Sequence, residues 1–149
     1  MKVSLACDHG AFELKESIKK HLEEKGIEYK DFGCYSKESV DYPRYAYAAA
    51  KPVADGEFDF GIICCTTGLG VSMAANKVKG IRAAVCTSEM LAEMTRRHNN
   101  ANVICMGQAV VSMELANKMV DIFLSTEFEG GRHQRRVDLI TAIEEGTIE

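Results

Sequence analysis

The feature that most constrains the fold of this chain is its alternation of short apolar segments with longer amphipathic ones. Residues 58–65 form the clearest apolar segment, and this character is typical of a parallel strand covered on both faces. Leu14, Ile18 and Leu22 recur every four residues among charged side chains, which predicts a helix ending at Gly26. The pattern therefore predicts strands and helices in turn.

The same criteria divide the whole chain into strands and helices. Five strands alternating with helices imply a three-layer α/β fold, a doubly wound parallel sheet with helices on both faces. The 149 residues fit a single domain, residues 1–149. The predicted strands cover residues 3–7, 27–32, 58–65, 81–86 and 103–106. The predicted helices cover 14–26, 43–54 (ended or bent at Pro52), 68–78, 88–97 with Ser88 as N-cap, 112–124, and a last segment from Arg132 with Val137, Ile140 and Ile143 on one side.

Composition narrows the class of partner. The formal net charge is −4, which does not favour a nucleic-acid surface. No segment approaches the roughly 20 apolar residues of a membrane span. The chain reaches Asp8 and His9 too early for a signal peptide. We therefore expect a cytoplasmic protein that binds neither nucleic acid nor membrane.

The chain has six cysteines, an even number that raises the question of disulfides. Four of them lie in apolar runs, where a free cysteine behaves as a small hydrophobic residue. No C-x-x-C pair occurs, which argues against a zinc ribbon or a thioredoxin-like site. Buried free thiols are the expectation.

Polar residues follow two of the predicted strands. Asp8 and His9 come after the first strand, and residues 65–70 come after the third. His98 and Asn99 lie between a helix and the fifth strand. Ligands of parallel sheets bind beyond the carboxyl ends of the strands, so these positions are predicted to converge on one crevice.

Gly68 and Gly70 lie between a strand and a helix. Backbone N–H groups there form either an ordinary tight turn or a nest that binds an oxyanion or phosphate. A dinucleotide fingerprint is a poor match, because it follows the first strand and needs a third glycine. Cys65, just before this turn, is either a buried strand-end thiol or a thiolate facing N–H dipoles.

Two interpretations are also open for each of the other candidate residues. Asp8 and His9 either cap a helix or bind a sugar hydroxyl and a phosphate, and His98 either interacts with a helix dipole or titrates in a site. Arg132 and Arg136 share a helical face, which is either a solvated basic surface or a phosphate-binding pair.

Taken together, these motifs resemble the ribose-5-phosphate isomerase B family, which includes galactose- and allose-phosphate isomerases. The resemblance covers nearly the whole chain. Its carriers are the segments 7–10 (CDHG), 41–43 (DYP), 61–70 (GIICCTTGLG), 74–77 (AANK), 80–83 (GIRA), 98–99 (HN) and 129–133 (EGGRH).

This resemblance implies a Rossmann-like fold and a homodimer or homotetramer with active sites at the subunit interface. It implies a sugar phosphate as substrate, no metal and no cofactor. The implied reaction is aldose–ketose isomerisation through a cis-enediolate. The family's base is either a cysteine ending the third strand or a glutamate after the second loop glycine. That second position is Val71, so the resemblance assigns the base to Cys65.

The resemblance also assigns the remaining roles. Thr67 or His98 would assist opening of the sugar ring, because the cyclic sugar has no free carbonyl. The amides of Gly68 and Gly70, with Asn99, would hold the enediolate oxygen. The residues implied to bind the rest of the substrate are Asp8 and Tyr42 for the sugar, His9, Arg132 and Arg136 for the phosphate, and His133 for either.

Two departures from the family pattern bear on the substrate. Thr66 replaces a glycine, which would be strained if that position needs a positive φ. Ala109 replaces an arginine of the phosphate site, and Gln108 is a candidate to compensate. A ribose 5-phosphate/ribulose 5-phosphate isomerase is the leading hypothesis. An isomerase of allose or galactose 6-phosphate and a non-catalytic phosphosugar-binding subunit are the alternatives.

Overall fold

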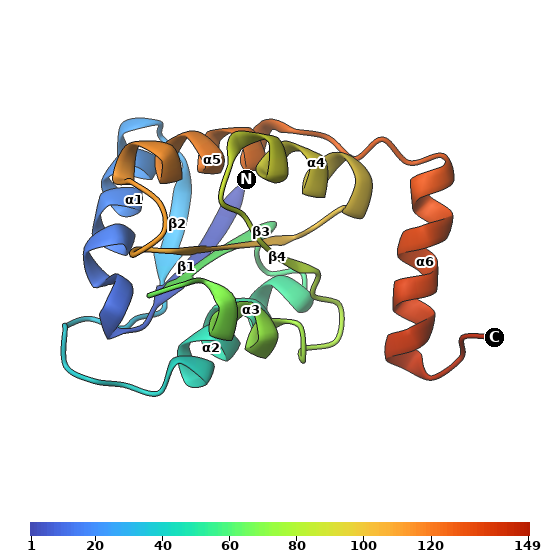
Figure 1. Cartoon of the computed structure of the whole chain (residues 1–149), viewed down its shortest axis with the longest axis horizontal. Helices are drawn as coiled ribbons and strands as arrows, with labels where there is room; N and C mark the ends of the chain where they lie inside the picture. The colour runs from blue at the N-terminus through green and yellow to red at the C-terminus, as the bar shows by residue number, and fades with distance from the viewer.

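The computed structural model describes residues 1–149 and contains one five-stranded parallel sheet (Figure 1). The spatial order of the strands is β2-β1-β3-β5-β4. The chain leaves β1 in one direction and returns to place β3 on the other side of it, which makes the sheet doubly wound as predicted. The strands are β1 (Lys2–Cys7), β2 (Glu28–Asp31), β3 (Phe60–Cys65), β4 (Ala83–Val85) and β5 (Val103–Gly107).

Helices cover both faces of this sheet (Figure 1). One face carries α1, α4 and α5, and the other carries α2 and α3. Strand side chains alternate between the two layers: Ile62 packs with the first group of helices and Ile63 with the second. The helices are η1 (His9–Ala11, a 3₁₀ turn), α1 (Phe12–Glu24), α2 (Tyr42–Ala54), α3 (Leu69–Ala75), α4 (Glu89–Asn99), α5 (Met113–Ser125) and α6 (Arg132–Glu145).

The predicted elements are all present, and the differences lie at their ends. α2 continues through Pro52 to Ala54, because a proline removes only its own N–H from the helical hydrogen bonds while Asp55 N–H still donates to Lys51. β4 is shorter than predicted because the side chain of Asn102 accepts from the N–H of Arg82, where a strand partner would otherwise bind. Ser88 caps α4 as expected, accepting from the N–H of Leu91.

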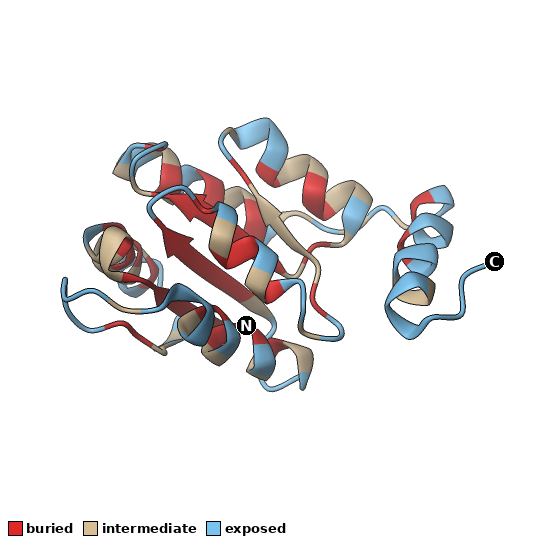
Figure 2. Cartoon of the chain, turned by 60° about the horizontal axis from the view of Figure 1, so that its bottom comes forward, coloured by how far each residue is buried: buried red, intermediate tan, exposed pale blue.

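The last helix, α6, stands away from the rest of the domain and touches it mainly through α4 (Figure 1). Its predicted apolar side is only partly covered: Val137 is buried, whereas Ile140 is 47% and Ile143 is 62% exposed. Figure 2 shows most of α6 as exposed surface, in contrast to the buried strands. Within one chain, therefore, the apolar face of α6 remains partly uncovered.

All six cysteines are free and buried, as the sequence predicts. None of the helices combines the length and the hydropathy that a membrane crossing requires.

Candidate active site

The loop after β3 places a thiol against a backbone donor. Cys65 Sγ accepts a hydrogen bond from the N–H of Gly68 at 3.1 Å, and this donor favours negative charge on the sulfur. Gly68 is needed for two reasons: its φ is +83°, and a Cβ there would lie 2.9 Å from the carbonyl carbon of Met106. The glycine therefore allows the turn that brings its own N–H to the sulfur.

Cys64 and Cys65 face opposite sides of the sheet. Cys64 faces the α1 layer, where complete burial raises its thiol pKa well above the usual value. Burial likewise raises the pKa of Cys86 to about 11. Cys65 faces the α2 layer, at the carboxyl edge of the sheet. Val71, at the family's alternative base position, is fully buried in that same layer.

Thr66 is not strained in the way the sequence suggested. Asn100 is the only non-glycine residue with a positive φ, so Thr66 adopts an ordinary backbone conformation. The tight contact lies instead at Gly10, where a Cβ would approach Thr66 Oγ1 to 2.1 Å and Asp8 Oδ1 to 3.4 Å. Asp8 Oδ1 also accepts from the N–H of Gly10 at 3.0 Å. Thr66 therefore packs over Gly10, beside Asp8.

Gly10→Ala is expected to displace the Thr66 hydroxyl and to destabilise the protein by roughly 1–3 kcal/mol, since the added methyl overlaps it. Thr66→Gly in the same chain removes the clashing oxygen and is expected to restore most of the lost stability. Urea denaturation of the single and double variants measures this coupling.

Gly107→Ala is the control for the pair Gly10→Ala and Thr66→Gly. Its Cβ would meet backbone atoms of Thr67 at 2.4 and 2.5 Å, which no side-chain change relieves. Combining Thr66→Gly with Gly107→Ala is therefore expected to recover little. Equal recovery at both glycines would contradict a specific contact between Thr66 and Gly10.

Three more predicted residues lie at this carboxyl edge. Asp8 caps the η1 turn, and His9 Nδ1 accepts from the N–H of Val40 at 3.1 Å. The Tyr42 ring lies over Gly70, where a Cβ would be 2.6 Å from ring atom Cε1. With Thr67 of the same loop, seven predicted residues gather at one edge: Asp8, His9, Tyr42, Cys65, Thr67, Gly68 and Gly70.

Thr67, in the same loop, is exposed, and its Oγ1 accepts from the N–H of Leu69 at 3.3 Å. The hydroxyl hydrogen therefore remains available to a ligand.

The prediction that His98 and Asn99 converge with Cys65 is wrong within one chain. These residues end α4, which runs back across the sheet and leads directly into the start of β5. They therefore lie at the amino edge, opposite the Cys65 loop. Arg82 Nε fixes this end of α4 by donating to the carbonyl of Asn99 at 3.0 Å.

A second cluster surrounds His98. Its ring stacks on His133 with centroids 4.2 Å apart and planes 9° apart. Burial, followed by repulsion from His98 and Arg132, lowers the pKa of His133. Arg132 and Arg136 extend the cluster along α6 and are both exposed, so positive charge is available at the surface. The five residues His98, Asn99, Arg132, His133 and Arg136 thus occupy a second region, remote from Cys65.

One part of this cluster has metal-binding residue types. His98, Glu129 and His133 place possible ligand atoms within 4.8 Å of one another. However, the His98 and His133 rings are stacked and nearly parallel. Their nitrogen lone pairs therefore point in parallel directions and do not converge on one metal position. Arg132 and Arg136 add positive charge nearby, and the cluster therefore suits an anion better than a metal ion.

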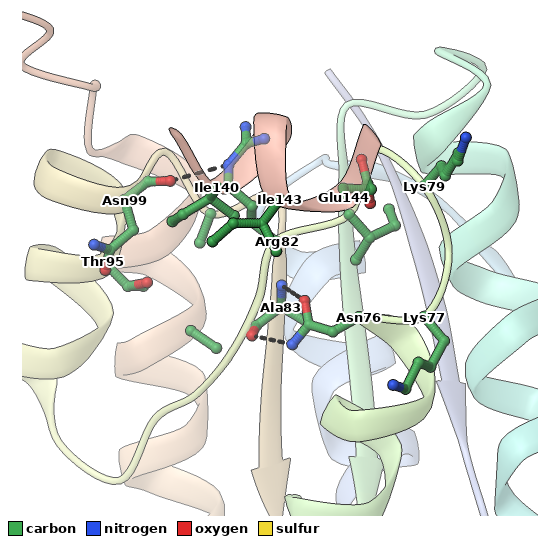
Figure 3. A pocket seen from close by; sticks show the side chains of 13 residues that line it. Asn76, Lys77, Lys79, Arg82, Ala83, Thr95, Asn99, Ile140, Ile143 and Glu144 are labelled. Atoms are coloured by element: carbon green, nitrogen blue, oxygen red, sulfur yellow. Dashed lines mark hydrogen bonds between the residues drawn. The ribbon is translucent and has the colours of Figure 1, made fainter. Parts of the chain in front are cut away.

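A pocket of about 710 Å³ lies between α6 and the amino edge of the sheet (Figure 3). Ile81, Ile140 and Ile143 form much of its apolar wall, and Glu144 accepts from the N–H of Gly80 across it at 3.1 Å. Asn99 is the one predicted site residue that lines it. The pocket is therefore separate from the Cys65 loop.

Gln108, the candidate to compensate for the missing arginine, is held through its side-chain oxygen. Its side-chain oxygen accepts from the N–H of Leu14 at 3.0 Å and so is committed to the first turn of α1.

Comparisons with known proteins indicate the same family as the sequence motifs. The model of the ribose/galactose isomerase family matches residues 3–140. Ribose-5-phosphate isomerase B of Escherichia coli is 51% identical over 144 residues, covering 97% of each chain.

Two solved structures are also closely similar. One is ribose-5-phosphate isomerase B of Clostridium thermocellum, with a TM-score of 0.97, 49% identity and coverage of 98% of this chain and 99% of that one. The other is the Mycoplasma genitalium enzyme with bound ribulose-5-phosphate, with a TM-score of 0.93, 44% identity and coverage of 97% and 96%. The chain described here belongs to the ribose/galactose isomerase family.

Proposed function

We propose that this protein interconverts ribose 5-phosphate and ribulose 5-phosphate through a cis-enediolate, with Cys65 as the base. The observation that carries the proposal is the Cys65 sulfur, held 3.1 Å from the N–H of Gly68 at the open edge of the sheet. A base for proton transfer beside a carbonyl must be able to carry negative charge, and donors must stand near the developing oxyanion. The Gly68 N–H beside the sulfur supports the first requirement, and the loop amides support the second.

In this mechanism the furanose first opens, with a proton leaving O1 and another reaching the ring oxygen O4. The Cys65 thiolate then takes the proton from C2 of the aldehyde, and the electron pair moves to O1. Loop amides, with Asn99, stabilise the enediolate oxygen. Returning the proton to C1 and moving the O2 proton to O1 yields the ketose.

We propose further that two copies of the chain form each active site. Cys65 and Asp8 lie at one edge of the sheet, whereas His98 and Arg132 lie at the other. The first region holds the thiol and the loop amides, and the second holds the exposed cations Arg132 and Arg136. The exposed apolar side of α6, including Ile140 and Ile143, supports pairing with a second copy. A homodimer, or a tetramer built from it, would join the two regions. The free cysteines support the cytoplasm as the compartment.

The substrate is tested by comparing purified protein on ribose 5-phosphate, allose 6-phosphate and galactose 6-phosphate. We expect kcat/KM for ribose 5-phosphate to exceed the other two by at least about tenfold. Thr66 packs over Gly10 beside Asp8 and therefore leaves less room at this edge for a longer sugar.

A reversed order would support the six-carbon alternative, which the absence of an arginine at Ala109 favours. Phosphosugar binding without turnover would support a non-catalytic subunit.

A further inference from the structure

Glu129 is the acidic residue of the second cluster. It lies in the segment between α5 and α6, where its N–H donates to the carbonyl of Arg97 at 3.0 Å. Its carboxylate lies 3.5 Å from His98 Nε2 and 3.6 Å from a guanidinium nitrogen of Arg97. Backbone and side chain therefore both hold Glu129 against the end of α4.

We propose that Glu129 is a positioning residue that sets the tautomer and orientation of His98 for opening of the sugar ring. This inference rests on the proposed function, because it concerns the same site. It adds to that function the group that sets the tautomer and orientation of His98.

A neutral imidazole ring carries hydrogen on only one nitrogen, and the hydrogen-bond partners of the two nitrogens determine which one. A carboxylate accepts but cannot donate, so Glu129 favours hydrogen on Nε2 of His98. The lone pair then lies on Nδ1, which can take a proton from the substrate.

His133 completes the arrangement by stacking on the face of the His98 ring. Its ring is buried, and its Nε2 has no hydrogen-bond partner. The stack restricts rotation of the His98 ring, while Glu129 determines the position of its hydrogen. The remaining charged groups of the cluster, Arg97, Arg132 and Arg136, are cationic and cannot supply an acceptor for Nε2–H.

The resulting step balances without another reagent. Nδ1 of His98 removes the proton from O1 of the furanose, the C1–O4 bond breaks, and a C1=O1 double bond forms. The same proton then passes from Nδ1 to O4. In the reverse direction the steps run backwards and close the ring.

Ribulose 5-phosphate provides the test, because phosphate on O5 prevents it from closing a furanose ring. Its C1 proton can exchange through Cys65 without any ring step. The experiment incubates the full-length protein with ribulose 5-phosphate in D₂O and follows two rates by NMR: deuterium entry at C1 and formation of ribose 5-phosphate. Wild type, Glu129→Gln and Glu129→Asp are compared.

We expect Glu129→Gln to lower the rate of ribose 5-phosphate formation about tenfold, with little change in KM, while deuterium entry stays within about twofold of wild type. The expected effect is modest because Glu129 is partly exposed. Glu129→Asp keeps the carboxylate and is expected to recover part of the loss. Glu127→Gln is the matched control, since Glu127 lies two residues away, is exposed and forms no ion pair, and it should leave both rates unchanged.

A parallel fall of both rates in Glu129→Gln would overturn the inference, because it would indicate general damage to the site. Unchanged rates would also overturn it. Absence of turnover in the wild-type protein would instead contradict the proposed function.

Discussion

Cys65→Ala is expected to lower kcat for ribose 5-phosphate by roughly a thousandfold, the usual scale for loss of a positioned base. The variant retains the loop glycines and the remote cationic cluster, so binding of the sugar phosphate should persist. Cys65 is 5% exposed, and loss of its sulfur leaves only a small space at the edge of the α2 layer. Steady-state kinetics and binding of the substrate to the variant measure the two effects separately.

Cys64→Ala is the matched control for this experiment. It removes the same atom one residue earlier, but from the opposite layer of the core. Activity per folded molecule should remain near wild type, with a loss of stability of about 1 kcal/mol. Comparable turnover in Cys65→Ala and Cys64→Ala would remove Cys65 as the base.

Mixing two inactive variants is expected to restore activity. Cys65→Ala damages one edge of the chain, and His98→Asn damages the other. In a mixed dimer, one of the two sites would combine an intact Cys65 from one copy with an intact His98 from the other. Random exchange of equal amounts makes half of the dimers mixed, so about a quarter of wild-type activity should return. The variants are unfolded and refolded together, and activity is then assayed.

The control mixes Cys65→Ala with a chain carrying both Cys65→Ala and His98→Asn. No combination of these chains contains an intact Cys65, so no activity should return. Failure of the first mixture to exceed the sum of its separate components would contradict a site shared between copies. Recovery in the first mixture alone would establish that the two edges meet across an interface.

Much of the fold follows from local patterns. The apolar segment ending at Cys65 predicted β3, and the four-residue spacing from Leu14 to Leu22 predicted α1. Such patterns predict an element because the repeat of a strand or a helix is set by residues close together in the sequence. The opposite orientations of Cys64 and Cys65 follow from the same alternation along a strand. Element ends were less accurate, since side chains distant in sequence determine them, as Asn102 does at Arg82.

The layered sheet, its doubly wound topology and the family of the chain follow from the amino-acid sequence alone, because they depend on hydrophobic periodicity and on the order of the motifs. Only the tertiary structure showed that Thr66 is unstrained and that Gly10 provides the space for it. The tertiary structure also separated His98 from Cys65. A helix that returns across a parallel sheet ends at the edge opposite the carboxyl ends of the strands, and His98 lies at such a helix end.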